Sequence, residues 1–178
     1  MKQSVNPMQK KPSRFAATVA LVLSLATSLA WSAPPAVGDA PPTLLGSDVE
    51  GQAVDLSRYA GKAVVVSFWA TWCPYCLKEL PILEGIQKTA GKERMQVIMV
   101  NTESREVFRK SARIMKDLSL LLAHDNDKRA SEAYGVTGIP HMVIIGRNGK
   151  ILRVHRGYDE SSLDAIVADI NRALAVPQ

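Results

Sequence analysis

An apolar strand that runs straight into a helix constrains this chain more than any other feature. Residues 62–70, KAVVVSFWA, are mostly apolar and rich in β-branched side chains. Such a run predicts a strand buried on both faces, as a central parallel strand is. The next segment predicts a helix, because Pro74 suits a first helical turn and Gly91 suits the end. We expect its apolar side to consist of Leu77, Leu80, Leu83 and Ile86.

The turn between this strand and helix carries the only two cysteines of the chain, Cys73 and Cys76. At the helix N-terminus, free N–H groups and the helix dipole favour a thiolate at Cys73, which makes it the expected nucleophile. Cys76 comes one turn later on the same face, within reach to close a disulfide. The order of strand, cysteine pair and helix is what a redox-active dithiol needs.

Two other interpretations of the pair are weaker. A structural disulfide stabilises mainly by closing a long loop, and this ring is very small. Zinc needs four ligands, but there is one cysteine pair, and the three histidines are scattered along the sequence. We therefore expect no metal at this site. The histidines are His124, His141 and His155.

The N-terminal segment predicts export. Residues 1–14 carry four basic side chains and no acid, and residues 15–30 are apolar and uncharged. A basic segment, an apolar run and then small residues form the pattern of a secretory signal, here residues 1–32. The alternative is an uncleaved inner-membrane anchor, although residues 15–30 are shorter than the roughly 20 residues of a typical span. Both interpretations place the remaining chain in the periplasm, an oxidising compartment.

The charge balance argues against a nucleic-acid partner. The chain has 22 basic and 17 acidic residues, but four of the basic ones precede residue 33. The remainder has 18 basic residues against 17 acidic ones, a net charge of +1. Residues 33–42 are Pro-rich and predict an extended linker outside the core. Residues 43–178 are then expected to form one domain.

The remaining sequence completes an α/β pattern. Alternating and apolar runs predict strands, and 3.6-residue periodicity predicts helices. The Asn148–Gly149 pair predicts a tight hairpin turn. We expect hairpins at 43–56 and 141–157, strands at 95–101 and 118–125, and helices at 104–118, 128–136 and 159–175. Parallel strands linked by a helix, followed by a hairpin and a final helix, indicate an α/β sandwich.

Two motifs resemble the thioredoxin superfamily, and specifically its exported TlpA/ResA/CcmG-like group. They are FWATWCPYCLKELP at 68–81 and YGVTGIPHMVIIGRNGKI at 134–151. The resemblance implies a thioredoxin fold, with a central mixed β-sheet flanked by helices, an N-terminal β-hairpin and a central insert around 101–127. It also implies thiol–disulfide exchange at Cys73 and Cys76, without a cofactor.

The resemblance assigns further roles by position. Pro140 matches the cis-proline that faces the cysteines in this superfamily, and the backbone near Ile139 would then pair with an extended substrate. Substrate contacts are also expected from Trp72, Pro74 and Tyr75. The role of His141, which follows Pro140, stays open between a strand-edge position and a ligand beside the cysteines.

Glu79 has two interpretations. It lies three positions after Cys76, one turn further along the same face. Relatives carry a glutamate there, and a partly buried carboxylate with a raised pKa could exchange a proton with Cys76. The alternative is a solvated glutamate that pairs with a neighbouring lysine such as Lys78 or Lys88.

The sequence therefore predicts a periplasmic thiol–disulfide oxidoreductase that reduces specific envelope clients, such as proteins of cytochrome c or copper-site maturation. Expected partners are disulfide-containing envelope proteins and a membrane thiol donor of the DsbD/CcdA type. One alternative is a copper or other metal-binding carrier on the same fold, and another is a disulfide oxidant or isomerase. A peroxiredoxin-type peroxidase is disfavoured, because it would have Thr at the position of Cys73.

Overall fold

The computed structural model describes residues 33–158 and 162–178. The predicted signal or anchor at 1–32 lies outside these residues, as does the start of the predicted helix at 159–161. Within the described ranges, no helix is long and apolar enough to cross a membrane.

One mixed sheet organises the described part of the chain, with seven strands in the order β2-β1-β5-β4-β3-β6-β7. Strands β3, β4 and β5 run parallel, while β6 pairs antiparallel with β3, and β1 pairs antiparallel with β5. The hairpins β1–β2 and β6–β7 end the sheet on its two sides. The strands are β1 Leu44–Ser47, β2 Ala53–Asp55, β3 Ala63–Trp69, β4 Met95–Asn101, β5 Leu121–His124, β6 His141–Ile145 and β7 Ile151–Arg156.

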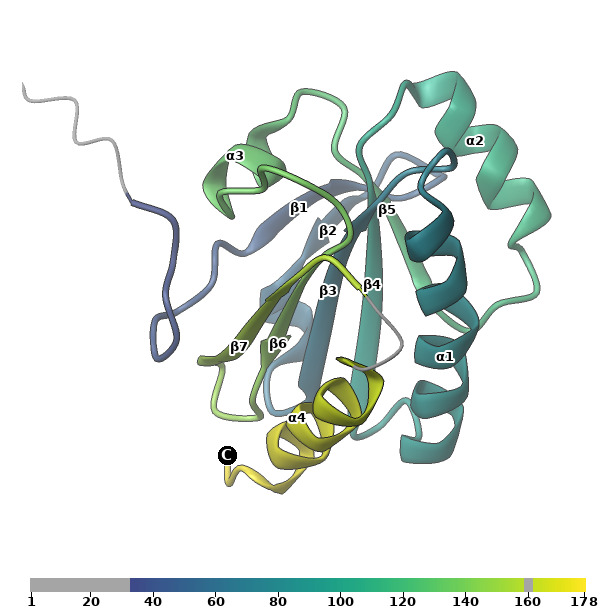
Figure 1. Cartoon of the computed structure of the whole chain (residues 1–178). Helices are drawn as coiled ribbons and strands as arrows, with labels where there is room; N and C mark the ends of the chain where they lie inside the picture. The colour runs from purple at the N-terminus through teal and green to yellow at the C-terminus, as the bar shows by residue number, and fades with distance from the viewer. Residues whose placement is uncertain (1–32, 159–161) are drawn as a thin grey trace, which may run out of the picture. The chain divides into compact units, whose positions relative to one another are not determined.

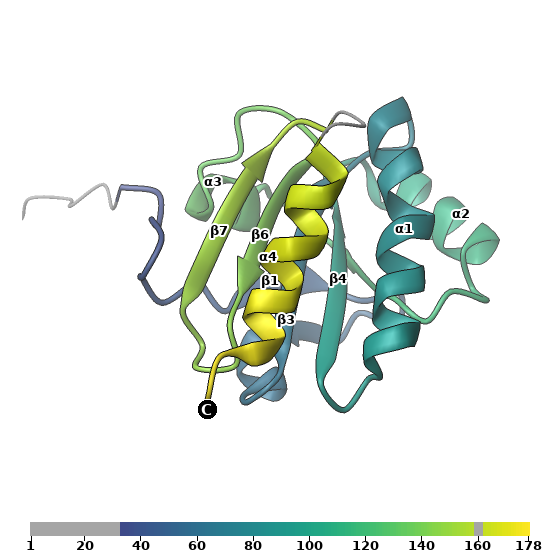
Figure 2. The same ribbon diagram turned by 60° about the horizontal axis from the view of Figure 1, so that its bottom comes forward.

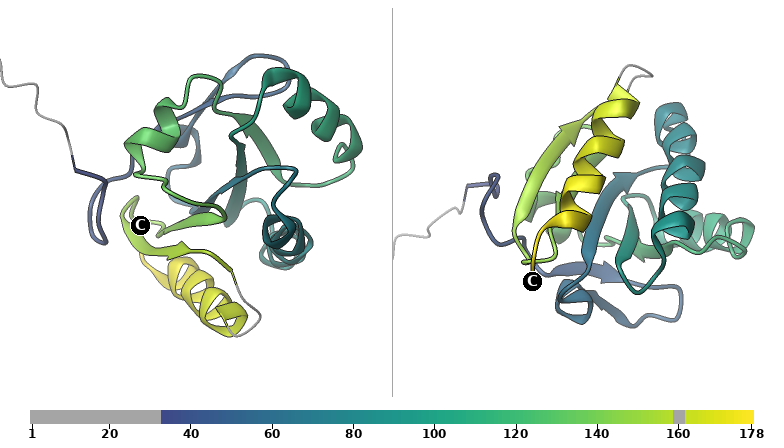
Figure 3. Two further views of the ribbon diagram at one scale, coloured as in Figure 1. Left: turned by 45° about the horizontal axis from the view of Figure 1, so that its top comes forward. Right: turned by 90° about the horizontal axis from the view of Figure 1, so that it is seen from below.

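The helices cover both faces of this sheet (Figure 1). Figures 2 and 3 show α1 and α4 side by side over one face. Helix α3 and Tyr134 contribute to the core on the other face, and α2 packs near β5. The helices are α1 Pro74–Ala90, α2 Arg105–Ile114, α3 Arg129–Ala133 and α4 Leu163–Ala175, with a 3-10 turn, η1, at Leu56–Tyr59. The predicted thioredoxin-like α/β architecture is confirmed, and the predicted insert contains α2 and β5.

Side-chain alternation along β3 divides the core into two layers. Val65 and Trp69 face α1 and α4, while Val64, Val66 and Phe68 face the opposite layer. All seven residues of β3 and all seven of β4 are buried. Such burial on both faces explains why these strands read as continuous apolar runs.

The predicted apolar side of α1 is partly wrong. Leu80 and Leu83 are buried and Ile86 is half-buried, but Leu77 is 43% exposed. The buried stripe instead includes Cys76 and two glutamates, so polar side chains take part of the surface that leucine was expected to fill.

The segment 33–42 contributes no residue to the two core clusters of the described chain, and it turns back on itself where an extended tether was predicted. It turns near Gly38, whose N–H donates to the Ile151 carbonyl at 2.8 Å, and the Ile151 N–H donates to the Asp39 carbonyl at 2.9 Å. Ile151 begins β7, which is an edge strand of the described sheet. These bonds occupy edge groups that would otherwise stay unpaired.

Candidate active site

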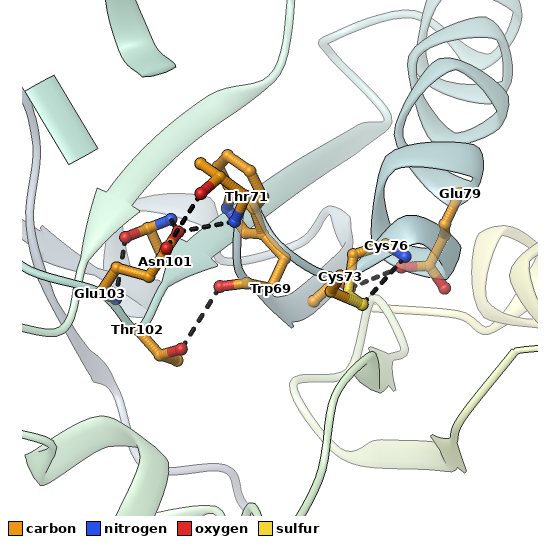
Figure 4. Close-up of a disulfide and its surroundings, with 9 residues drawn as sticks. Trp69, Thr71, Cys73, Cys76, Glu79, Asn101, Thr102 and Glu103 are labelled. Carbon is orange, nitrogen blue, oxygen red and sulfur yellow. Dashed lines mark hydrogen bonds between the residues drawn. A yellow bond between two sulfur atoms is a disulfide. The ribbon is translucent and has the colours of Figure 1, made fainter. Parts of the chain in front are cut away.

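The junction between β3 and α1 places the two cysteines. Cys73 is the N-cap of α1 and is joined to Cys76 by a disulfide, with the two Cα atoms 5.3 Å apart (Figure 4). The Cys76 backbone N–H donates to Cys73 Sγ at 3.2 Å. A donor aimed at this sulfur at a helix N-terminus stabilises negative charge on it once the disulfide is opened.

The disulfide is buried, but the residues around it are exposed. Cys73 is 3% exposed and Cys76 0%, whereas Trp72 and Tyr75 are 70% and 52% exposed. Trp72 directly precedes Cys73 and Tyr75 lies between the two cysteines, so both expose apolar surface next to the disulfide in the sequence. Exposed large apolar side chains beside a reactive group are typical of a protein-contact surface.

Glu79 lies in the same helix and is 2% exposed (Figure 4). The Ser67 hydroxyl donates to Glu79 Oε2 at 2.7 Å. Burial raises the pKa of Glu79 to about 7, although the Ser67 hydrogen bond opposes this shift. The solvated interpretation of Glu79 is therefore wrong, and Lys88 pairs with Glu84 instead, at 2.9 Å.

Pro140 directly precedes β6, at the same end of the sheet at which β3 leads into the cysteine loop. The Ile139–Pro140 peptide bond is cis, as the resemblance implied. Phe68 pairs with His141, so Pro140 lies next to the end of β3. That strand ends at Trp69, four residues before Cys73. Ile139 packs against the core cluster that contains both cysteines.

His141 does not join this site. It lies in β6, which pairs with strands on both sides, so the strand-edge interpretation is wrong. Its side chain meets the Phe68 ring edge-on, in the layer opposite to the cysteines. Burial, and secondarily the charge of Arg156, lower the pKa of His141 to about 4. Because it faces away from the sulfurs, His141 cannot bind a ligand beside them.

The other two histidines lie elsewhere. His124 contacts the Glu103 carbonyl, and His155 contacts Asp169 at 2.8 Å. Within the part of the chain that the structure describes, no group of three or more His, Cys, Asp or Glu side chains is arranged to hold a metal ion.

Sequence reasoning missed Ser67, the partner of Glu79. It also missed Glu103, which contacts the loop before Cys73. Ser67 left a signal, since it is the one hydroxyl residue in an otherwise apolar strand. A fully buried hydroxyl needs a hydrogen-bond partner, and Glu79 supplies it from α1.

Known proteins resemble this chain over most of the described domain. A family model described as Redoxin matches residues 36–174. The thiol-disulfide oxidoreductase ResA of Geobacillus thermodenitrificans is 30% identical over 122 residues, which are 68% of this chain and 70% of that protein. ResA of Halalkalibacterium halodurans is 30% identical over 110 residues, and the match spans 62% of each chain.

Among solved structures, a putative thiol:disulfide interchange protein DsbE from Chlorobium tepidum superposes with a TM-score of 0.68. It is 28% identical, and the match covers 78% of this chain and 98% of that one. The fold, the cysteine pair at the helix terminus and these relatives agree. The chain belongs to the Redoxin family and, within the thioredoxin superfamily, to the thiol–disulfide oxidoreductases related to ResA and CcmG.

Proposed function

We propose that this protein is a periplasmic reductant of disulfides in specific envelope proteins. In the reduced form, the Cys73 thiolate attacks a partner disulfide, one partner sulfur leaves as a thiolate, and a mixed disulfide forms. Cys76 then attacks Cys73 Sγ and releases the second partner thiolate. The partner gains two electrons, and the Cys73–Cys76 pair loses them.

The burial of Glu79 and its raised pKa are the observation that supports this mechanism best. Cys76 must lose its proton before it can attack, and it is completely buried. Glu79 lies one turn further along α1, with a pKa of about 7. A carboxylate that gains and loses a proton near neutral pH suits a general base that takes the Cys76 proton and later returns it.

The surroundings of Cys73 support this direction of transfer. A strongly oxidising pair needs a highly stabilised thiolate. Pro74 and Tyr75, which separate the cysteines, carry no charge, and His141 faces the opposite layer. The Cys76 N–H and the helix terminus remain as the main stabilising groups, and this modest set supports a reductant.

Clients would bind over the exposed side chains of Trp72, Tyr75 and Leu77. An extended client segment would pair with the backbone at Ile139, beside Pro140, which places its disulfide next to Cys73. Cytochrome c apoproteins and copper-site assembly proteins are the client classes we propose. A membrane thiol donor of the DsbD/CcdA type would reduce the protein again, and residues 1–32 would direct its export as a cleaved signal or an anchor.

A trapping experiment tests the roles of the two sulfurs. Cys76→Ser should accumulate mixed disulfides with envelope proteins on non-reducing gels, because no second thiol can release the partner. Cys73→Ser is the matched control and should trap few or none. Equal trapping by both variants would show that Cys73 is not the attacking sulfur.

Equilibration with glutathione tests the direction. We expect a midpoint potential below about −180 mV, on the reducing side of protein disulfide isomerase. A value near about −120 mV, where the strong oxidant DsbA lies, would overturn the reductant assignment and leave the exchange chemistry intact.

A further inference from the structure

The loop that carries Cys73 is held by a second loop, which the chemistry above does not use. Strands β3 and β4 are parallel, and Trp69 pairs with Asn101 at their last positions. Both strands therefore end at the same end of the sheet, and the residues that follow them lie side by side (Figure 4). The Thr102 N–H donates to the Trp69 carbonyl at 3.2 Å, which is the first tie between the two loops.

Glu103 makes the main contacts between these loops. Its Oε2 accepts the backbone N–H of Thr71 at 2.6 Å, and its Oε1 accepts the Thr71 hydroxyl at 2.9 Å. Thr71 is two residues before Cys73. One side chain therefore fixes both the backbone and the side chain of a residue in the short turn that leads to the nucleophile.

Glu103 is itself held from the sheet side. Its N–H donates to Asn101 Oδ1 at 3.0 Å, and Asn101 Nδ2 donates to Glu103 Oε2 at 3.2 Å. The His124 ring nitrogen Nε2 lies 2.8 Å from the Glu103 carbonyl, and the ring stacks on Phe108. Asn101 and His124 are both buried. These contacts restrain the Glu103 backbone and side chain. Its carboxylate can therefore restrain Thr71 in turn.

We propose that Glu103 is a positioning residue for thiol–disulfide exchange: its contacts with Thr71 hold Cys73 where the Cys76 N–H and the α1 terminus stabilise the thiolate. The N–H to sulfur distance is 3.2 Å, and such a bond weakens steeply when its angle changes. A loosened loop would therefore leave the thiolate less stable and less populated. This inference rests on the proposed role of Cys73 as the nucleophile.

Two variants separate the contacts of Glu103 from its charge. Glu103→Ala and Glu103→Gln both remove the charge. Glutamine keeps two contacts, because its oxygen can accept the Thr71 N–H and its amide can donate to the Thr71 hydroxyl. The rate of Cys73 alkylation by iodoacetamide in the reduced protein reports the thiolate, and mass spectrometry identifies the modified cysteine. At neutral pH, Glu103→Ala should react about fivefold more slowly than Glu103→Gln.

Glu106→Ala is the matched control, because it removes an exposed glutamate three residues further along without touching Thr71. It should alkylate at the wild-type rate. Equal rates for Glu103→Ala and Glu103→Gln would overturn the proposal. If Glu103→Ala does not fold, Thr71→Val replaces it, with a slowing of about twofold expected from the lost hydroxyl contact, and an unchanged rate would be contradictory.

This test is independent of the physiological direction. Alkylation needs no client and no redox partner, so an oxidising midpoint potential would defeat the reductant assignment without affecting the ratio of the two variants. Conversely, equal alkylation rates would remove the role of Glu103 and leave the reductant assignment standing.

Discussion

Helix α1 buries two glutamates, and they behave in opposite ways. Glu79 is 2% exposed and Glu84 is 6% exposed, so both carboxyl groups are largely removed from water. Burial raises the pKa of Glu79 to about 7. Burial also acts on Glu84, but hydrogen bonds from Lys88 and Ser119 outweigh it and hold the pKa of Glu84 below its ordinary value.

The difference lies in the number of partners. Glu84 accepts the Ser119 N–H at 2.9 Å and the Ser119 hydroxyl at 3.0 Å, and it pairs with Lys88. Among the residues that the structure describes, Glu79 has one hydrogen-bond donor, the Ser67 hydroxyl. A well-partnered carboxylate stays charged and ties α1 to the loop before β5. A poorly partnered one exchanges its proton near neutral pH, which is useful beside a thiol.

Glu79→Gln should give the largest effect, which is on the pH dependence of the free energy of unfolding. Below pH 4.5 Glu79 is protonated in both states, whereas between pH 4.5 and about 7 only the native state keeps the proton. The free energy of unfolding should therefore fall as pH rises through this window, by about 3 kcal/mol in total. Glu79→Gln should abolish this fall in the oxidised protein, as measured by urea unfolding at several pH values.

The exposed Glu93→Gln is the control for this profile and should keep the wild-type slope. Parallel profiles for the wild type and Glu79→Gln would show that Glu79 does not titrate in this window. The same variant should also change the pH dependence of thiol exchange.

Glu84→Ala should have the next largest effect, and it should act on stability alone. Alanine has no acceptor, so the Ser119 N–H and hydroxyl lose their side-chain partner. We expect the free energy of unfolding to fall by about 2 kcal/mol, with no change in the alkylation rate of Cys73. A changed alkylation rate with an unchanged free energy of unfolding would show that Glu84 acts on the thiol chemistry and not on stability.

Ser67→Ala tests whether the hydrogen bond from Ser67 sets the pKa of Glu79. The Ser67 hydrogen bond favours the charged form of Glu79, so its loss should raise the pKa of Glu79 further above about 7. The pH at which the free energy of unfolding stops falling should move upward accordingly. Ser111→Ala, at a buried serine whose hydroxyl bonds the Phe108 carbonyl, is the control. An unmoved profile would exclude Ser67 from setting this pKa.

Lys88→Ala should give the smallest effect. Lys88 is 63% exposed, and pairs of this kind contribute about 0.5 kcal/mol or less, which salt reduces further. Urea unfolding at low and high salt measures this contribution. A loss well above about 1 kcal/mol would mean that Lys88, rather than Ser119, determines the environment of Glu84.

The sequence predicted the elements of this fold because their signals are local. The β-branched run of β3, Pro74 in the first turn of α1, Gly91 at its end and the Asn148–Gly149 turn each act within a few residues. The cysteine pair at the helix N-terminus was predictable for the same reason.

What the sequence could not predict depends on contacts between distant segments. The burial of Glu79 in place of Leu77 follows from how α1 is rotated against β3 and β4, which periodicity alone leaves undetermined. The Ser67–Glu79 and Glu103–Thr71 pairs require strands and loops to be placed in three dimensions. The turn at Gly38 depends on the free edge of β7, which is known only once the strand order is known.

The titration of Glu79 is the most direct test of the proposed proton exchange with Cys76. In the oxidised protein the cysteines do not titrate, so carbon-13 NMR of the glutamate side-chain carboxyl carbons can follow this group, with Glu79→Gln assigning its signal. We expect a midpoint at about pH 7. A midpoint near the ordinary value of 4.5 would mean that Glu79 stays charged at neutral pH, and it would contradict the proposed proton exchange with Cys76.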